Sequence, residues 1–311
     1  MTHARRTSGS TTAPSGRDRP SPAENQPPQM VDAHMHVWDP ARASYPWLTA
    51  DLAVLDRRFG LDDVADEQAA HGVARAVLVQ SVDNVPDTLN MFHQAAHGTD
   101  RHRAVDVAGI VAWVPLDSPT QAARLLDSWA DQPIVGVRHL IHRQSDPDWV
   151  LRTDVSAGLD LLAERGLAFD VCAERLDLLA KVPVLAERHP GLRLVIDHLA
   201  KPPIAASGWQ PWADLLSESA AAPNVTAKIS GLNTAAAPGW TSADLQPYID
   251  HALATFGPHR LMVGGDWPVA LLQARSYSQV WQAICQALAG LDQADHEAVF
   301  GGTATAVYRL R

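Results

Sequence analysis

A regular alternation of short apolar runs with amphipathic stretches, beginning at Met30, constrains the fold of this chain most strongly. We identify eight runs with strand character, centred on His34, Val77, Val111, Val137, Phe169, Val195, Lys228 and Val263. Most neighbouring runs are separated by a segment whose apolar residues recur at helical spacing. Apolar strands that alternate with helices indicate a parallel sheet covered on both faces. Eight such units favour an α/β fold of the closed (β/α)8 type, the TIM barrel.

A doubly wound sheet is the main rival to this barrel. Such a sheet usually carries a Gly-x-Gly-x-x-Gly turn after its first strand, and the sequence contains none. The segment 39–60, which follows the first strand, has few secondary-structure signals and is expected to be a long loop. Long loops of this kind often shape an active site.

Capping signals predict where several helices begin. Ser118 and Pro119 are typical of a helix start, because serine caps a helix and proline suits its first turn. Asp154 is expected to cap a helix, and Thr241 with Asp244 resembles a capping box. A further helix is expected over 209–220.

Composition limits the domain organisation and the classes of partner. Residues 1–29 are rich in Ser, Thr, Pro and Arg and predict a disordered tail, whereas 30–311 suit one barrel domain. No secretory leader or membrane-spanning run is evident, and the two cysteines, Cys172 and Cys285, fit a reducing compartment. We therefore expect a cytoplasmic protein. The net charge of -10 argues against nucleic-acid or membrane partners.

Ionisable side chains follow several of the predicted strands. His34 and His36 stand two residues apart, so both would project from one face of the first strand. Others lie near the ends of later strands: Arg138, His139, His142, Asp170, Asp197, His198, Lys201, Lys228 and Asp266. In a barrel of this kind, chemistry occurs at the carboxyl ends of the strands. Several buried charges in one place make sense where they meet a metal, a substrate or each other.

Sequence motifs between residues 31 and 310 resemble those of the amidohydrolase superfamily, in its amidohydrolase-related branch. More narrowly, they are similar to sugar-acid lactonases of the L-fuconolactonase and L-rhamnonolactonase type. The matching segments are VDAHMHVWDP, YPWL, VGVRHL, DPDW, VIDHLAKPPI, KISGL, FGPHRLMVGGDWPV and FGGTATAVYRL. Their order is specific for the family and much less specific for one substrate.

The resemblance implies a reaction centre formed by His34, His36, His198 and Asp266, with one divalent ion, Zn2+ by preference, among them. Two-metal relatives carry a lysine or glutamate on the fourth strand and a histidine on the fifth. This chain has Arg138-His139 and Asp170-Val171-Cys172 there, so a bridged pair of metals is not expected. Some similar lactonases are thought to work without metal, and the sequence leaves both mechanisms open.

The resemblance further implies hydrolysis of a small lactone by an activated water. Asp266 would be the general base, with His198 as its catalytic neighbour. Substrate contacts are assigned to Arg138, His139, Lys201, Trp38 and Trp267, because arginine suits planar anions and flat rings suit sugar faces. The expected partner is a small-molecule lactone, and a homo-oligomer is left open.

Each assignment has a structural rival. Asp266 would also suit a helix N-cap, His198 would also close a strand, and Arg138 would also pair with Asp170. The lysines and tryptophans would also suit packing roles. Two other functions compete at the level of the whole chain: a metal-dependent decarboxylase or hydratase of a small carboxylic acid, and a non-catalytic binding protein.

Overall fold

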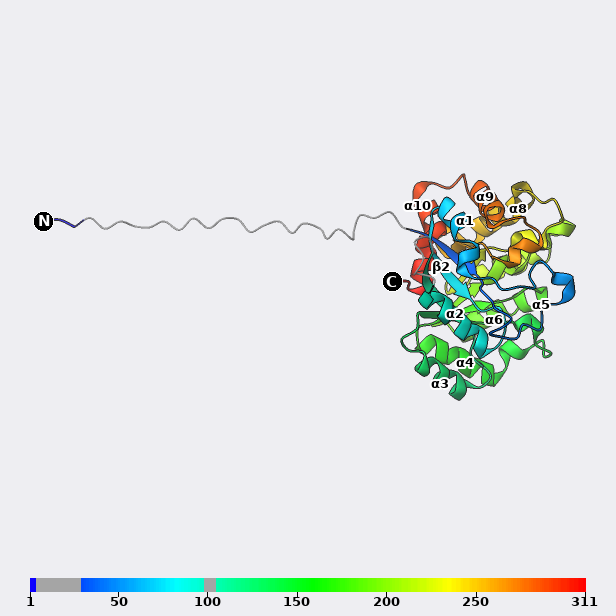
Figure 1. Cartoon of the computed structure of the whole chain (residues 1–311), viewed down its shortest axis with the longest axis horizontal. Coiled ribbons are helices and arrows are strands. Elements are labelled where there is room, and N and C mark those ends of the chain that lie inside the picture. Colours follow the sequence, from blue (N-terminus) through cyan, green and yellow to red (C-terminus); the bar gives the residue numbers. More distant parts are fainter. Residues whose placement is uncertain (4–28, 98–104) are drawn as a thin grey trace.

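A computed structural model describes residues 1–3, 29–97 and 105–311 of the chain (Figure 1). The predicted disordered tail, 1–29, lies almost entirely outside the described residues. Within the described ranges, no helix is both long and apolar enough to cross a lipid bilayer.

Eight parallel strands form one sheet in chain order, and each strand pairs with the next. The strands are β1 (Met30–Met35), β2 (Val73–Val79), β3 (Asp106–Ala112), β4 (Ile134–His139), β5 (Ala168–Val171), β6 (Arg193–Ile196), β7 (Val225–Ile229) and β8 (Leu261–Val263). All eight predicted strands are confirmed, and the fold is a TIM barrel. The apolar runs form strands of a parallel sheet because both faces of such a sheet are buried, so side chains on both sides of each strand are apolar.

Backbone bonds beyond the last strand close the barrel. The His36 N–H donates to the Trp267 carbonyl at 2.7 Å, and the Asp266 N–H donates to the His34 carbonyl at 2.8 Å. Gly264 permits this approach, because a Cβ atom there would lie 2.7 Å from the His34 Cβ atom. The closure therefore joins the two segments that carry the first-strand histidines and Asp266.

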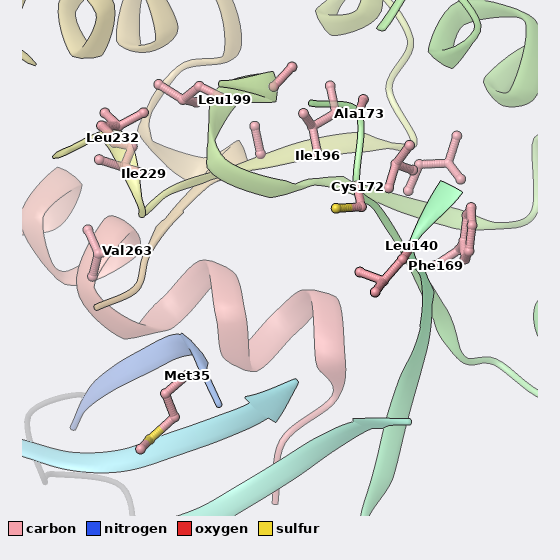
Figure 2. Close-up of a cluster of buried hydrophobic side chains, with 14 of the residues drawn as sticks. Met35, Leu140, Phe169, Cys172, Ala173, Ile196, Leu199, Ile229, Leu232 and Val263 are labelled. Atoms are coloured by element: carbon pink, nitrogen blue, oxygen red, sulfur yellow. The ribbon is translucent and has the colours of Figure 1, made fainter. Parts of the chain in front are cut away.

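Helices surround the sheet (Figure 1). They are α1 (Ala65–Ala70), α2 (Val85–His97), α3 (Pro119–Ser128), α4 (Thr153–Glu164), α5 (Leu176–Leu179), α6 (Val182–Arg188), α7 (Trp212–Ala220), α8 (Ser242–Phe256), α9 (Tyr277–Ala287), α10 (Gln293–Glu297) and α11 (Thr303–Tyr308). The larger apolar core lies between strands and helices. Figure 2 shows part of it, including Ile196, Ile229 and Val263 from three neighbouring strands.

A second apolar cluster fills the interior of the barrel. Inward-facing strand residues such as Val77, Val111 and Val195 pack there against Tyr308 of α11. The interior changes character along the strands, because the next inward-facing residues are charged, as at Arg138 on β4. The apolar cluster therefore forms the floor beneath a polar layer.

Helix boundaries differ from the sequence expectations in several places. The Thr241–Asp244 capping box is confirmed, with the Thr241 N–H donating to Asp244 Oδ2 at 2.7 Å. The Asp154 cap is wrong: α4 begins at Thr153, and the Asp154 carboxylate binds the Arg152 side chain instead. The helix expected over 209–220 begins at Trp212.

Helix α2 was not among the helices predicted from sequence. Its buried face carries Asp87, Thr88 and Asn90 beside Met91 and Phe92, so its apolar residues lack helical spacing. Those polar groups are buried because they bind neighbouring segments. Asp87, for example, accepts the Ser81 backbone N–H at 2.9 Å.

Candidate active site

A β-bulge in β1 determines where the first two histidines point. Between Asp32 and Met35, three residue steps on β1 match two on β2. The extra residue inverts the alternation of side chains. Before the bulge Ala33 packs in the barrel interior, whereas Met35 after it packs in the outer core. His34 and His36 consequently enter the interior at the carboxyl ends of the strands.

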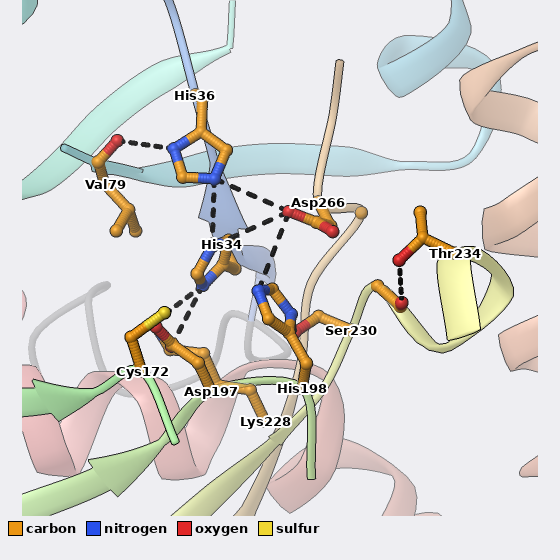
Figure 3. A network of polar contacts seen from close by, with 12 residues as sticks. His34, His36, Val79, Cys172, Asp197, His198, Lys228, Ser230, Thr234 and Asp266 are labelled. Atoms are coloured by element: carbon orange, nitrogen blue, oxygen red, sulfur yellow. Dashed lines mark hydrogen bonds and ion pairs between the residues drawn. The ribbon is translucent and has the colours of Figure 1, made fainter. Parts of the chain in front are cut away.

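Three imidazole rings meet there, and each has its Nδ1 atom against a fixed partner (Figure 3). His36 Nδ1 lies 2.7 Å from the Val79 carbonyl oxygen, and His198 Nδ1 lies 2.8 Å from Ser230 Oγ. The Val79 carbonyl only accepts, so His36 carries its proton on Nδ1 and offers a lone pair on Nε2. Ser230 donates or accepts, so the proton of His198 has a choice of nitrogen.

His34 also has two proton positions. Its Nδ1 atom lies 3.2 Å from Asp197 Oδ1 and 3.1 Å from Lys228 Nζ, and its Nε2 atom lies 3.1 Å from His36 Nε2. With the proton on Nδ1, it faces Asp197, and two Nε2 lone pairs converge where a cation would satisfy them. With the proton on Nε2, His34 donates to His36 while Lys228 donates to Nδ1. The site thus accommodates both a metal-bound and a metal-free state.

Asp266 supplies the fourth group of the cluster. Its Oδ1 atom lies 3.5 Å from His36 Nε2, 3.7 Å from His34 Nε2 and 3.9 Å from His198 Nε2. The carboxylate is buried, and neither oxygen has a hydrogen-bond partner among the described residues. A buried carboxylate without partners costs several kcal/mol, roughly, unless a ligand or ion satisfies it.

The spacing of these atoms suits a tetrahedral metal ion. Bonds of about 2.0–2.1 Å to nitrogen and oxygen place neighbouring ligand atoms about 3.3–3.4 Å apart. Among His34 Nε2, His36 Nε2 and Asp266 Oδ1 the observed separations run from 3.1 to 3.7 Å. His34, His36 and Asp266 form the tightest group, and His198 lies beside it. Their neutral nitrogens and one carboxylate match the donors that Zn2+ prefers.

Burial shifts the pKa values of the site in a consistent way. Burial, together with Lys228, holds the pKa of His34 well below its usual value, and burial lowers the pKa of His198 to about 4. Burial opposes the charge of Asp266, but His198, His36 and Lys201 outweigh it and hold its pKa below the usual value. At neutral pH His34 and His198 are therefore neutral and Asp266 is ionised.

A buried charged layer supports the cluster from below. Lys228 Nζ lies 2.5 Å from Asp170 Oδ2 and 3.2 Å from Asp197 Oδ1. The Tyr308 hydroxyl of α11 donates to Asp170 at 2.8 Å. Burial disfavours ionisation of Asp197, but Lys228, His34 and Arg138 hold its pKa well below normal. The layer fixes the carboxylate that faces His34.

The structural alternative for Arg138, an ion pair with Asp170, is wrong. These residues are register neighbours on β4 and β5, but Asp170 binds Lys228 and Tyr308. Arg138 Nε instead lies 2.8 Å from Asp197 Oδ2. Sequence spacing cannot distinguish two carboxylates on adjacent strands, because both face the same interior.

Left-handed backbone positions several of the site residues. The four residues from His198 to Lys201 all have positive φ, between 49° and 59°, and Asp266 has a φ of 51°. Such conformations cost about 1–2 kcal/mol for residues other than glycine. Strain of this kind concentrates at functional sites. Here it turns His198 inward and brings Lys201 Nζ to 3.9 Å from Asp266 Oδ2.

A cavity of about 460 Å³ opens onto the cluster. Of the predicted site residues, it is lined by His36, His198, Asp266, Arg138 and Lys201. It also has an apolar wall, formed by Trp47, Leu52, Leu55, Val269 and Leu272. The cavity thus presents both reactive polar groups and apolar side chains to a small molecule.

Four predicted residues do not line this cavity. His34 lies beneath its lining. Trp38 is fully buried and donates to the Arg57 carbonyl at 2.8 Å, and Trp267 packs against Phe59. His139 Nε2 accepts from Trp113 Nε1 at 2.9 Å. Trp38, Trp267 and His139 therefore support the wall, and their assignment to substrate contact stays a prediction.

Sequence reasoning missed other residues of the site. Ser230 and Gly231 follow β7, where Gly231 leaves room for the cluster: a Cβ atom there would lie 2.3 Å from Asp266 Oδ2. Glu174 lines the cavity two residues after Cys172. The KISGL motif contained the signal for the first two, but only the fold shows what they contact.

The sequence of this chain matches a family model and several known proteins. The family model described as amidohydrolase matches residues 31–310. The L-fucono-1,5-lactonase of Burkholderia ambifaria is 35% identical over 284 residues, covering 90% of this chain and 95% of the relative. The L-fucono-1,5-lactonase of Burkholderia multivorans is 32% identical, covering 90% and 96%.

A solved structure agrees with these matches. An amidohydrolase from Burkholderia multivorans with bound zinc is 33% identical and has a TM-score of 0.81. The match covers 91% of this chain and 99% of that one.

Proposed function

The chain belongs to the amidohydrolase family, and on this premise we propose that it hydrolyses the ring ester of a small sugar-acid lactone. The relatives named L-fucono-1,5-lactonase, at 32–35% identity, support this substrate class. One observation carries the proposal: the ionised Asp266 carboxylate faces a cavity among three imidazoles and finds no hydrogen-bond partner in the part of the chain that the structure describes. A water molecule beside it would find both a base and a polar surface.

The protein groups divide the reaction between them. Asp266 would accept the proton of the attacking water as the water adds to the lactone carbonyl. The same proton would then pass to the ring oxygen when the ester bond breaks. Without a bound metal, His198 would stabilise the developing charge, because Ser230 allows its proton to sit on Nε2 and donate to the oxyanion.

The four residues His34, His36, His198 and Asp266 would hold a divalent ion. When bound, the ion would supply a Lewis acid that polarises the carbonyl oxygen. Zinc in the Burkholderia multivorans amidohydrolase supports this choice of metal.

The mixed polar and apolar lining of the cavity favours a lactone that carries both hydroxyl groups and apolar carbon atoms. Lys201 Nζ is partly exposed near Asp266, within reach of a ring hydroxyl. Trp47 and Leu272 also line the cavity and would contact the carbon skeleton. Water exclusion by these side chains would strengthen the polar contacts.

A pH-indicator screen of sugar lactones tests the proposal, with chelator-treated and zinc-loaded protein measured side by side. Acid release from at least one sugar-acid lactone is expected, well above that of the Asp266→Asn protein. Acid release only after zinc loading would support a metal-dependent reaction. Acid release in both samples would support a metal-free reaction. No turnover of any lactone, together with CO2 release from a small aromatic acid, would overturn the proposal in favour of a decarboxylase.

A further inference from the structure

We propose that His142, Cys172 and Glu174 form a second divalent-metal site, on the wall of the same cavity and separate from the proposed reaction centre. Its nitrogen, sulfur and oxygen ligands suit Zn2+ or Co2+. This inference does not depend on which substrate the protein takes.

The three ligand atoms already lie close together. Cys172 Sγ lies 3.3 Å from His142 Nδ1 and 3.6 Å from Glu174 Oε1, and all three atoms are within 4.8 Å of one another. With bonds of about 2.3 Å to sulfur and about 2.0–2.1 Å to nitrogen or oxygen, a tetrahedral ion separates such atoms by about 3.5–3.6 Å. The ion would therefore fit with small side-chain movements.

Two separate strand ends supply the ligands. His142 lies in the turn Ile141–Arg143 after β4, whereas Cys172 and Glu174 follow β5 directly. Figure 2 shows the Cys172 sulfur pointing from the strand into the barrel. His142 and Glu174 line the cavity, whereas Cys172 is fully buried behind them, so an ion would bind from the cavity side and could keep a water ligand there.

The surroundings suit a coordinated thiolate. Arg138 Nη2 donates to Cys172 Sγ at 3.2 Å, and such N–H groups commonly support metal-bound ligands. Thiolate and carboxylate together balance the charge of a divalent ion. Burial lowers the pKa of His142, and although burial opposes the charge of Glu174, Lys201 and His142 lower its pKa.

Metal binding at this site has a defined proton balance. Burial raises the pKa of the Cys172 thiol well above its usual value, so the free side chain keeps its proton. When the ion binds, the S–H bond breaks, the S–metal bond forms and the proton leaves to solvent. The ion would occupy the cavity beside Arg138, so we expect excess zinc to inhibit turnover.

Cobalt substitution distinguishes the two sites, because only this one contains sulfur. Chelator-stripped protein is titrated with Co2+ while the thiolate-to-cobalt charge-transfer band in the near ultraviolet is recorded. A band that grows in with bound cobalt is expected in the wild-type protein. The Cys172→Ser protein should lose the band and one equivalent of cobalt while retaining the equivalent at the imidazole cluster.

Matched variants keep the test decisive. Cys285→Ser, which changes the other cysteine on α9, should leave the band intact. If Cys172→Ser fails to fold, Glu174→Gln and His142→Gln replace it in the test. Each of these variants should weaken, at least tenfold, the cobalt binding that produces the thiolate band. Absence of a thiolate band in the wild-type protein, or its persistence in the Cys172→Ser protein, would overturn the proposal.

Discussion

Asp266 and His34 are linked twice, once through the backbone and once through their side chains. The Asp266 N–H donates to the His34 carbonyl at 2.8 Å, and Asp266 Oδ1 lies 3.7 Å from His34 Nε2. The first contact helps to close the barrel, and the second belongs to the candidate active site. The position of the proposed base therefore depends on the seam between the first and last strands.

Replacing Asp266 with asparagine should lower turnover by at least about 100-fold, because general-base catalysis contributes about 10²–10⁴-fold. Asparagine has the same shape and tolerates left-handed backbone, so the fold should remain intact. Lactone hydrolysis and circular dichroism check the two halves of the prediction. Asp127→Asn, at an exposed position on α3, should change neither. More than about a tenth of the wild-type rate in the Asp266→Asn protein would count against the base assignment.

Replacing Gly231 with alanine should reduce turnover by about 100-fold, because a new methyl group would push against the reacting carboxylate. Its Cβ atom would lie 2.3 Å from Asp266 Oδ2 and 2.8 Å from His198 Nδ1. Gly239→Ala is the matched control, since Gly239 also has positive φ but open space around it. Both variants should lose about 1–2 kcal/mol of stability from backbone strain, and only the first should lose activity. Equal activities would contradict the steric argument.

Replacing Lys228 with methionine should destabilise the protein by about 3–5 kcal/mol, because two buried carboxylates would lose their shared cation. The residues affected are Asp170 and Asp197. Urea unfolding measures the loss, and the added change Asp170→Leu should recover part of it. Lys181→Met breaks a pair with an exposed partner, Asp148, and should cost about 1 kcal/mol or less. A loss below about 1 kcal/mol for Lys228→Met would show that the charged layer is not needed for stability.

The pH dependence of stability should reveal the buried ring of His198 in the metal-free protein. Burial lowers its pKa from 6.5 to about 4, so the unfolded chain binds the proton first as the pH falls. Its stabilising contribution is complete above pH 6.5 and is lost as the pH approaches 4. Burial raises the pKa of Asp32 to about 6, which acts in the opposite sense, so the test compares variants.

The stability difference between wild type and His198→Gln should accordingly shrink as the pH falls through this window. Unfolding free energies from urea titrations at several pH values provide the measurement. His259→Gln, which changes a ring whose side chain is 75% exposed, serves as the surface control. A level difference for His198→Gln would contradict the lowered pKa.

The eight strands and the polar residues at their ends were predictable from sequence, because both are local patterns. His34, His36, His198 and Asp266 do meet, as the motifs implied. The bulge in β1 was not predictable, since it depends on pairing with β2 and reverses the facing of Ala33 and Met35. Likewise, the pairing of Arg138 with Asp197 was not predictable, because it depends on the fold bringing Tyr308 of α11 to Asp170.

Tyr308 has a consequence for how the protein matures during synthesis. Its hydroxyl binds Asp170, which in turn binds Lys228 beneath His34. A ribosome makes Tyr308 only after every strand has been translated. A nascent chain still lacking this residue would hold the Asp170 carboxylate without its phenol, so the support beneath the first histidine is completed only after β8 and the helices α9 and α10 that follow it have been made.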